Sequence, residues 1–299
     1  MKRYIPAVFL CAVLAVLLPG KAPGLDLRIQ GGTGNVSFDT TRESSLAGET
    51  FNPRLYPAGL VSFSGIHADW IHYSAAFERD PVLRNRLTAA VGLDLSFVKF
   101  EAGVLIGPFN TREKPISPGA MGGLTLTWPG VIFGSVKGSS TLGSSLGLTG
   151  DYIQETAEIA FGFWVPNVIC GFSFSSAGFS RRSSEILIIK DQRTRYQFTA
   201  DVHAKNVPYT VKVNMGYQNL GRLYSPAGSA FGVSDTDELK SVFLGFEGAW
   251  RVVPGLQILA GAEMPLYSWA KEPMKKPDSN AALFSVHAGV IWTLAGKTR

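Results

Sequence analysis

The chain has 299 residues, a formal net charge of +5 and only 17% charged residues, and its mean hydropathy of +0.13 is barely positive. No long unbroken apolar run occurs beyond the N-terminus, which excludes a helical membrane protein. The basic residues Lys2, Arg3 and Lys21 lie in the first 24 residues, which hold no acid. Without that segment the charge falls to about +2, so the chain offers little to attract nucleic acid.

Residues 1–24 are predicted to be a secretory signal peptide. Met1-Lys2-Arg3 is followed by an apolar run from Tyr4 to Leu18 and then by small residues up to Gly24. Lipidation at Cys11 is disfavoured because Leu10 precedes it where a small residue is required. Residues 25–299 are then expected to form a single domain in which Cys170 has no disulfide partner.

From residue 25 onwards, apolar and polar residues alternate in segments that are separated by turn residues, which is the pattern of β-strands. Fourteen segments are predicted, near residues 25–29, 61–63, 71–77, 87–95, 98–106, 124–128, 131–138, 157–165, 168–174, 196–202, 209–217, 242–252, 256–264 and 284–294. The second segment and residues 131–138 are weakly patterned, so twelve or eight strands remain alternatives.

The connections between these segments alternate in length. Short ones fall near residues 67–69, 96–97, 129–130, 166–167, 205–208 and 253–255. Mostly longer, polar ones fall near 39–57, 79–85, 109–118, 139–152, 178–193, 219–238 and 265–281. This alternation is typical of periplasmic turns and extracellular loops. We therefore predict an all-β fold, a transmembrane antiparallel up-and-down β-barrel, with a soluble sandwich or soluble barrel as the alternative.

Tryptophan supports the barrel. Five of the six, at positions 70, 128, 164, 250 and 292, lie beside a short connection or at the end of the last strand. Indole prefers the membrane interface because its ring is apolar and its N–H needs a polar partner. These residues are expected to form an aromatic girdle.

The last segment carries the most specific motif. Phe284, Val286, Ala288, Val290, Trp292 and Leu294 share one face, opposite Ser285, His287, Gly289, Ile291 and Thr293. His287, Gly289, Trp292 and Leu294 resemble the C-terminal insertion signal of bacterial outer-membrane barrels, although five residues follow here. The resemblance implies bacterial outer-membrane lipid and the barrel-assembly machinery as partners.

Inward-facing charges are the candidate functional residues. The alternation turns Asp26, Arg28, Glu78, Asp94, Lys99, Glu101, Glu158, Arg195, Asp201, Lys212, Glu247, Arg251 and Glu263, with His287, toward the lumen. Charges enclosed by lipid need partners or water, so this wall is expected to be wet or joined by ion pairs. Eight acids against five bases indicate a slight cation preference.

No residue is predicted to be catalytic, and no metal or other cofactor is expected. His72 and Ser74 share a face in the manner of a base and a nucleophile, but we interpret them as ordinary lumen residues. Basic fragments at Arg181-Arg182, 190–195 and 271–276 are expected on outer loops. The run from Ile186 to Ile189 is predicted to extend a hairpin above the membrane, with a loop segment folded into the lumen as the alternative.

The number of strands and a mature length of about twenty residues per strand resemble compact monomeric OmpG-type porins. This resemblance implies a monomeric outer-membrane channel for passive diffusion of small hydrophilic solutes. Two alternatives stay open. One is a FadL-like carrier of hydrophobic ligands, which requires an apolar pocket or a lateral opening. The other is a surface adhesin whose barrel only presents loops.

Overall fold

The computed structural model describes residues 25–35, 55–67, 70–107, 117–142, 152–184, 187–203, 207–226, 235–270 and 284–294. The predicted signal peptide and the basic fragment 271–276 lie outside these ranges. No helix in the described part of the chain is long and apolar enough to cross a membrane. The strands are β1 (Leu25–Gly34), β2 (Tyr56–His67), β3 (Ile71–Asp80), β4 (Arg84–Leu95), β5 (Val98–Gly107), β6 (Ser117–Trp128), β7 (Ile132–Thr141), β8 (Tyr152–Val165), β9 (Val168–Ser184), β10 (Leu187–His203), β11 (Tyr209–Pro226), β12 (Asp235–Val253), β13 (Leu256–Ala270) and β14 (Ser285–Leu294).

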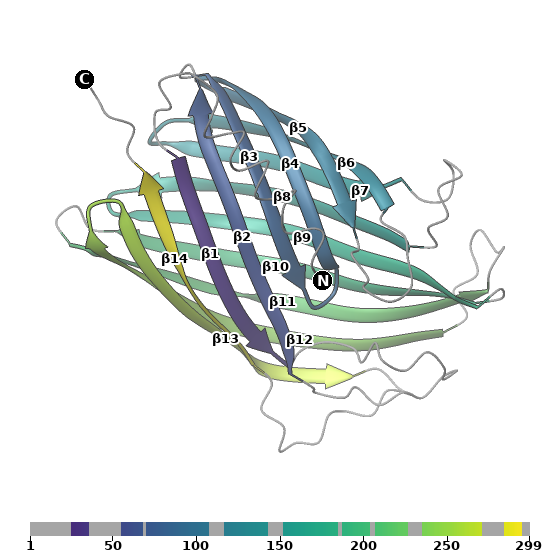
Figure 1. The fold of residues 1–299 in the computed structure, drawn as a ribbon. Coiled ribbons are helices and arrows are strands. Elements are labelled where there is room, and N and C mark those ends of the chain that lie inside the picture. The colour runs from purple at the N-terminus through teal and green to yellow at the C-terminus, as the bar shows by residue number, and fades with distance from the viewer. Residues whose placement is uncertain are drawn as a thin grey trace.

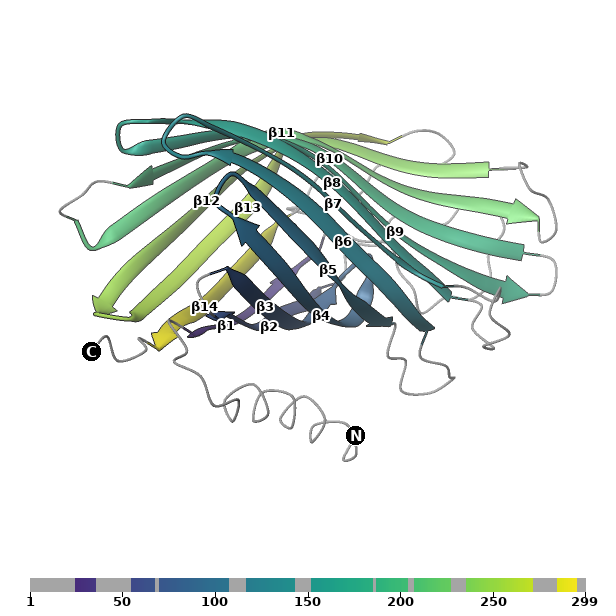
Figure 2. The same ribbon diagram turned by 90° about the horizontal axis from the view of Figure 1, so that it is seen from above.

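These strands form a closed antiparallel barrel. Each strand pairs with its neighbours in the chain, and β14 closes the wall against β1, with Leu27 opposite Trp292 and Ile29 opposite Val290. The fourteen-stranded prediction is confirmed, and the alternatives of twelve and eight strands are wrong. Figure 1 shows that the strands of the wall are tilted. In Figure 2 the side of the barrel formed by β1–β5 faces the side formed by β8–β12 across the interior.

The outer face of the barrel is apolar and exposed. Trp128 is 65% exposed, Phe161 59% and Val104 57%, although a soluble barrel or sandwich would pack this aromatic-rich face into a core. Large apolar side chains in this number are stable on an outer surface only where lipid covers them. The outer face is therefore the lipid-facing side.

Aromatic side chains border this apolar band at both ends. Near the short turns, Trp70, Trp128, Trp250 and Trp292 are all exposed. At the other level, the rings of Phe174, Tyr196, Tyr217, Trp269 and Tyr267 follow one another across β9–β13 with centroids 5.1 to 6.3 Å apart. Tyr209 and Tyr217 lie eight residues apart on β11, roughly 21 Å along the barrel axis at the usual strand tilt, close to the ~25 Å band of outer-membrane barrels.

Trp164 differs from the expected girdle. Its neighbours Phe163 and Val165 are exposed on the outer face, so Trp164 points inward, and its ring packs edge-on against Phe133 at 5.1 Å. The short turns are otherwise as expected. Ser96, Gly130, Asn167 and Gly255 adopt positive φ angles there, and Gly and Asn tolerate that conformation best.

The opposite end of the barrel departs from the sequence-based expectation. The predicted loops 178–193 and 219–238 are largely strand, because β9 and β10 are joined by residues 185–186 alone and β11 runs on to Pro226. The fragment 190–195 accordingly lies in β10 and not on a loop, and Arg181-Arg182 lies in β9. Of the run 186–189, residues 187–189 begin β10 and so extend its hairpin with β9, and residue 186 lies outside the described ranges.

β13 also extends past its predicted end, to Ala270. A bulge beside Phe243 adds one residue to β13, so both Leu266 and Tyr267 are exposed to the outside. The bulge shifts the phase of the alternation after Pro265, which is why the sequence pattern suggests a loop there. We call this end of the barrel the long-connection end.

Candidate functional site in the lumen

The connection between β3 and β4 bends into the barrel. Val82 and Leu83 are each 2% exposed, whereas a surface turn would leave them in solvent. Gln154, on β8, donates a hydrogen bond from Nε2 to the carbonyl oxygen of Leu83, 71 residues away in sequence. Residues Asp80–Arg84 therefore cross the interior, and we call them the docked turn.

An ion network fastens one side of the docked turn. The Asp80 carboxylate accepts hydrogen bonds from the backbone N–H groups of Val82 at 2.7 Å and Leu83 at 2.9 Å, which shape the turn. Its second oxygen accepts a hydrogen bond from Arg193 of β10, with Nη2 at 2.9 Å. Side chains 113 residues apart are thus joined across the lumen.

A second set of charges holds the other side. Arg222 of β11, only 1% exposed, donates from Nε and Nη2 to the two oxygens of Asp191 at 2.7 and 3.1 Å. Arg84 Nη2 lies 3.4 Å from the same carboxylate, and its guanidinium carbon lies 5.7 Å from the centre of the Phe179 ring. A bidentate arginine with a second arginine is an arrangement that fixes a carboxylate firmly.

Arg84 also has a strained backbone, with φ of +67°. A non-glycine residue in this region costs on the order of 1–3 kcal/mol and persists when its surroundings impose it. The contacts of the Arg84 side chain with Asp191 and Phe179 hold its backbone in this conformation.

Apolar side chains on the inner face are buried at the same end of the barrel. They are Leu105, Phe179, Ile189, Leu220 and Leu239. If the lumen of this fourteen-stranded barrel were open, these side chains would face water. Their burial indicates that this part of the lumen is filled, and the docked turn is the segment that fills it.

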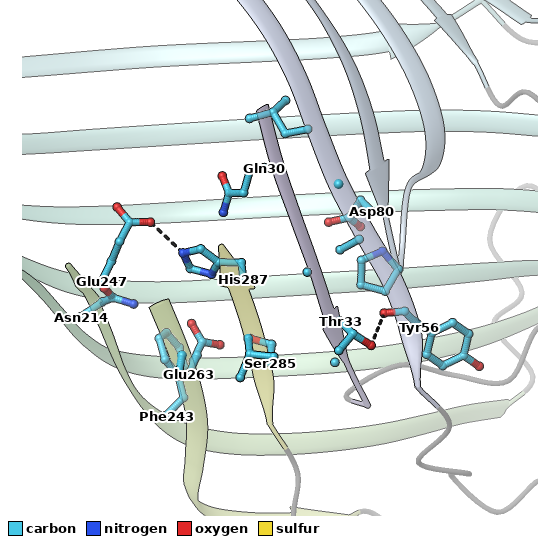
Figure 3. A pocket seen from close by; sticks show the side chains of 18 of the residues that line it. Gln30, Thr33, Tyr56, Asp80, Asn214, Phe243, Glu247, Glu263, Ser285 and His287 are labelled. Carbon is cyan, nitrogen blue, oxygen red and sulfur yellow. Dashed lines mark hydrogen bonds and ion pairs between the residues drawn. The ribbon is translucent and has the colours of Figure 1, made fainter. Parts of the chain in front are cut away.

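Beside the docked turn lies a cavity of about 430 Å³. β1–β3 line one side of it and β10–β14 the other, as Figure 3 shows for Gln30, Asp80, Asn214 and Glu263. Six of the predicted lumen residues line it: Glu78, Arg195, Lys212, Glu247, Glu263 and His287.

Most charges at the cavity are paired. Arg195 Nη2 lies 2.5 Å from Glu263 Oε2, and its guanidinium stacks 4.1 Å from the centre of the Phe243 ring. His287 Nε2 lies 2.8 Å from Glu247 Oε2, the contact dashed in Figure 3, and Arg28 lies 4.0 Å from the same oxygen. The wall is therefore joined by ion pairs, as the sequence suggests.

The other eight predicted residues lie outside the cavity lining, nearer the short turns. They are Asp26, Arg28, Asp94, Lys99, Glu101, Glu158, Asp201 and Arg251. Register sets Asp94 opposite Lys99 and Asp201 opposite Lys212, so charges of opposite sign alternate round the wall.

Several inward charges were missed by the sequence analysis because they lie in segments interpreted as loops. Arg193 and Asp191 lie two and four residues before Arg195, so the alternation of a strand places all three on the same face of β10. That spacing could have revealed them. Among the described side chains the inner face carries ten bases, Arg28, Arg84, Arg86, Lys99, Lys137, Arg193, Arg195, Lys212, Arg222 and Arg251, and ten acids, Asp26, Glu78, Asp80, Asp94, Glu101, Glu158, Asp191, Asp201, Glu247 and Glu263. The acid excess that suggested a cation preference is absent from this wall.

The residues of the predicted insertion signal have clear structural places. Trp292 and Leu294 lie on the outer face, both exposed, while His287 faces the cavity. Gly289 lies against the carbonyl oxygen of Ile29, where a Cβ atom would find no room. Recognition of this motif by the assembly machinery stays a prediction.

His72 and Ser74 show no catalytic arrangement. The ring nitrogens of His72 are buried without a hydrogen-bond partner among the described residues, and Ser74 lies opposite Ser64 and Ala90. Within the described ranges, no group of three His, Cys, Asp or Glu residues could hold a metal ion.

No protein-family model and no curated protein sequence matches the chain. Solved structures match over most of its length. An outer-membrane channel from Pseudomonas putida F1 shares 9% identity with a TM-score of 0.47 and covers 93% of this chain and 97% of its own. A loop-deletion mutant of OmpT, an outer-membrane protein of Vibrio cholerae, shares 9% identity with a TM-score of 0.42, covering 91% and 99%. An anion-selective porin from Comamonas acidovorans shares 8% with a TM-score of 0.41, covering 91% and 99%. All three are similar to this chain only as closed barrels.

Proposed function

We propose that this chain is a monomeric, porin-like channel of the bacterial outer membrane that lets small hydrophilic solutes diffuse passively through a lumen narrowed by the docked turn. The observation that carries this proposal is the contrast between the two faces of the closed wall. The outer face is apolar and exposed, and the described side chains of the inner face include ten bases and ten acids, several of which line the cavity.

The docked turn sets the width of the passage. Fourteen strands enclose more space than their own side chains fill, since eight-stranded barrels are already just filled and those of sixteen or more hold open channels. Here the connection between β3 and β4 occupies part of that space, with Asp80 paired to Arg193 and Arg84 paired to Asp191. The remaining route passes the cavity beside β10–β14, so only small solutes are expected to cross.

A balanced wall makes the channel nearly indifferent to the sign of charge. Ion selectivity follows the charges that line the narrow part of a pore. Because the described side chains of the inner wall include equal numbers of acids and bases, we expect cations and anions to permeate at similar rates.

The two rival functions receive less support. A carrier of hydrophobic ligands requires an apolar pocket, but the cavity is lined by paired charges and amides. An adhesin would act through the outer connections, most of whose residues lie outside the described ranges.

Planar-bilayer recording of the refolded full chain tests the proposal. We expect steady ohmic openings of low conductance, with a reversal potential close to zero in a potassium chloride gradient. A barrel that inserts and remains silent would overturn the channel in favour of a structural or adhesive role. A strongly shifted reversal potential would overturn the balanced wall alone.

A further inference from the structure

The cavity beside the docked turn has the size and lining of a small-molecule site. Ligand sites in proteins commonly have volumes of about 300–1,000 Å³, and this cavity measures about 430 Å³. Eight strands, β1–β3 and β10–β14, contribute to its walls together with the start of the docked turn, so the barrel itself sets its shape. The cavity lies directly beside the docked turn, whose first residues, Asp80 and Pro81, belong to its lining.

Most of the charges that line the cavity are paired within the protein, although Arg79 also lines it. Asp80 pairs with Arg193, Glu263 with Arg195, and Glu247 with His287. Glu78, which also lines the cavity, pairs with Arg86 at 2.6 Å, and Lys212 lies between Asp201 and Glu247 in register. A charged solute would have to displace one of these partners and leave a charge uncompensated, so ionic ligands are disfavoured.

The uncharged polar groups of the lining are amides and hydroxyls. Gln30, Gln197, Asn214 and Gln218 place four carboxamides around the cavity, and Tyr56 and Ser285 add hydroxyl groups. No side-chain hydrogen bond to another described residue is recorded for Asn214 or Gln218. A carboxamide both donates and accepts, and so does an alcohol, which makes the two well matched.

Apolar groups also belong to the lining, among them the side chains of Ala58 and Leu60 on β2. The largest apolar ring of the lining, Phe243, is 1% exposed and lies beneath the Arg195 guanidinium. The buried aliphatic side chains of the inner face lie around the docked turn and are shielded from the cavity. A hydrocarbon could contact these apolar side chains, but it would also leave the amides and paired charges of the lining without hydrogen-bond partners, at a cost in free energy.

We infer that this cavity is a saturable binding site for a neutral polyhydroxylated solute of mono- or disaccharide size. The inference deepens the proposed channel function and rests on it in that the solute reaches the site through the lumen. Amides of β10 and β11, Gln197 and Asn214, hydrogen-bond the hydroxyl groups. The paired charges of Arg195 with Glu263 and of Glu247 with His287 offer further donors and acceptors without selecting a charge.

Equilibrium binding to the refolded full chain tests the site independently of conduction. The probe is labelled maltose, measured by dialysis across the millimolar range, with tetraethylene glycol as a competitor of similar size that accepts hydrogen bonds but donates few. We expect saturable maltose binding that the glycol does not displace. Gln197→Leu and Asn214→Leu should each weaken it about five- to tenfold, the factor for one lost hydrogen bond of about 1 kcal/mol.

Gln257→Leu is the matched control, because Gln257 is an amide on the inner face of β13 outside the cavity lining. It should leave maltose binding unchanged. Absence of saturable binding, equal loss in all three variants, or displacement of maltose by citrate or glycine betaine would each overturn the inference. Swelling of liposomes in glycerol reports the channel separately: swelling without maltose saturation overturns only the site, and no swelling with any solute overturns the proposed channel.

Discussion

Breaking the ion pair between Asp80 and Arg193 should release the docked turn and widen the channel. The pair is largely buried, with side-chain exposures of 11% for Asp80 and 23% for Arg193. Removing one partner of a buried pair costs about 3–5 kcal/mol, because the other charge is left uncompensated. The substitution Asp80→Asn keeps the shape of the side chain and can still accept from the N–H groups of Val82 and Leu83.

The free-energy cost of leaving Arg193 unpaired destabilises the docked turn and not the barrel. When the turn is released, water solvates Arg193 and this cost is removed. A difference of about 3 kcal/mol shifts the ratio of docked to released turns more than a hundredfold, since each 1.4 kcal/mol is a factor of ten. The double substitution Asp80→Asn with Arg193→Gln should shift it less than either single one, because neither charge is then left alone.

Single-channel recording measures this directly. We expect Asp80→Asn to show larger openings, or flicker between the wild-type level and a larger one, and exchange of the two charges to restore the wild-type level. Glu155→Gln is the matched control, because Glu155 pairs with Lys190 on the outer face of the same wall. If Asp80→Asn folds normally and conducts as the wild type does, the docked turn is not the constriction.

Three further outcomes are expected. Arg222→Met leaves Asp191 buried with only the more distant Arg84, so the free energy of unfolding in vesicles, followed by tryptophan fluorescence in urea, should fall by about 3 kcal/mol; a change below 1 kcal/mol would contradict the network. Val104→Arg places a charge on the lipid-facing band and should cost about 2–4 kcal/mol in the same assay, and a neutral result would remove β5 from the lipid-facing wall. Trp292→Ala should slow folding assisted by the assembly machinery while spontaneous folding in detergent keeps its rate, and equal slowing would show a purely structural role.

The barrel itself could be predicted because its information is local. Alternation of period two sets the face of each residue, and turn residues such as Pro129-Gly130 and Pro254-Gly255 mark the ends of strands. The seam between β1 and β14 also followed, since Leu27 and Trp292 carry matching outward patterns. The six lumen residues that meet at the cavity were identified by the same parity.

The docked turn could not be predicted, because its contacts join residues that are distant in sequence. Nothing near Asp80 indicates that its partner is Arg193, and Gln154 is one polar residue among many until it reaches the Leu83 carbonyl. Alternation gives the face of a strand and says nothing about which opposite side chains meet.

The same contacts explain why the long-connection end was interpreted as loops. A transmembrane strand normally alternates apolar outside with polar inside. Around the docked turn the inner face carries buried apolar residues, Ile189, Leu220 and Leu239, among its paired charges, while Lys190 and Lys240 face outward beyond the lipid band. The hydropathy phase inverts there although the strand continues. An inverted phase at the end of a predicted barrel strand therefore indicates a segment packed inside the lumen, and in this chain it marks the surface that receives the docked turn.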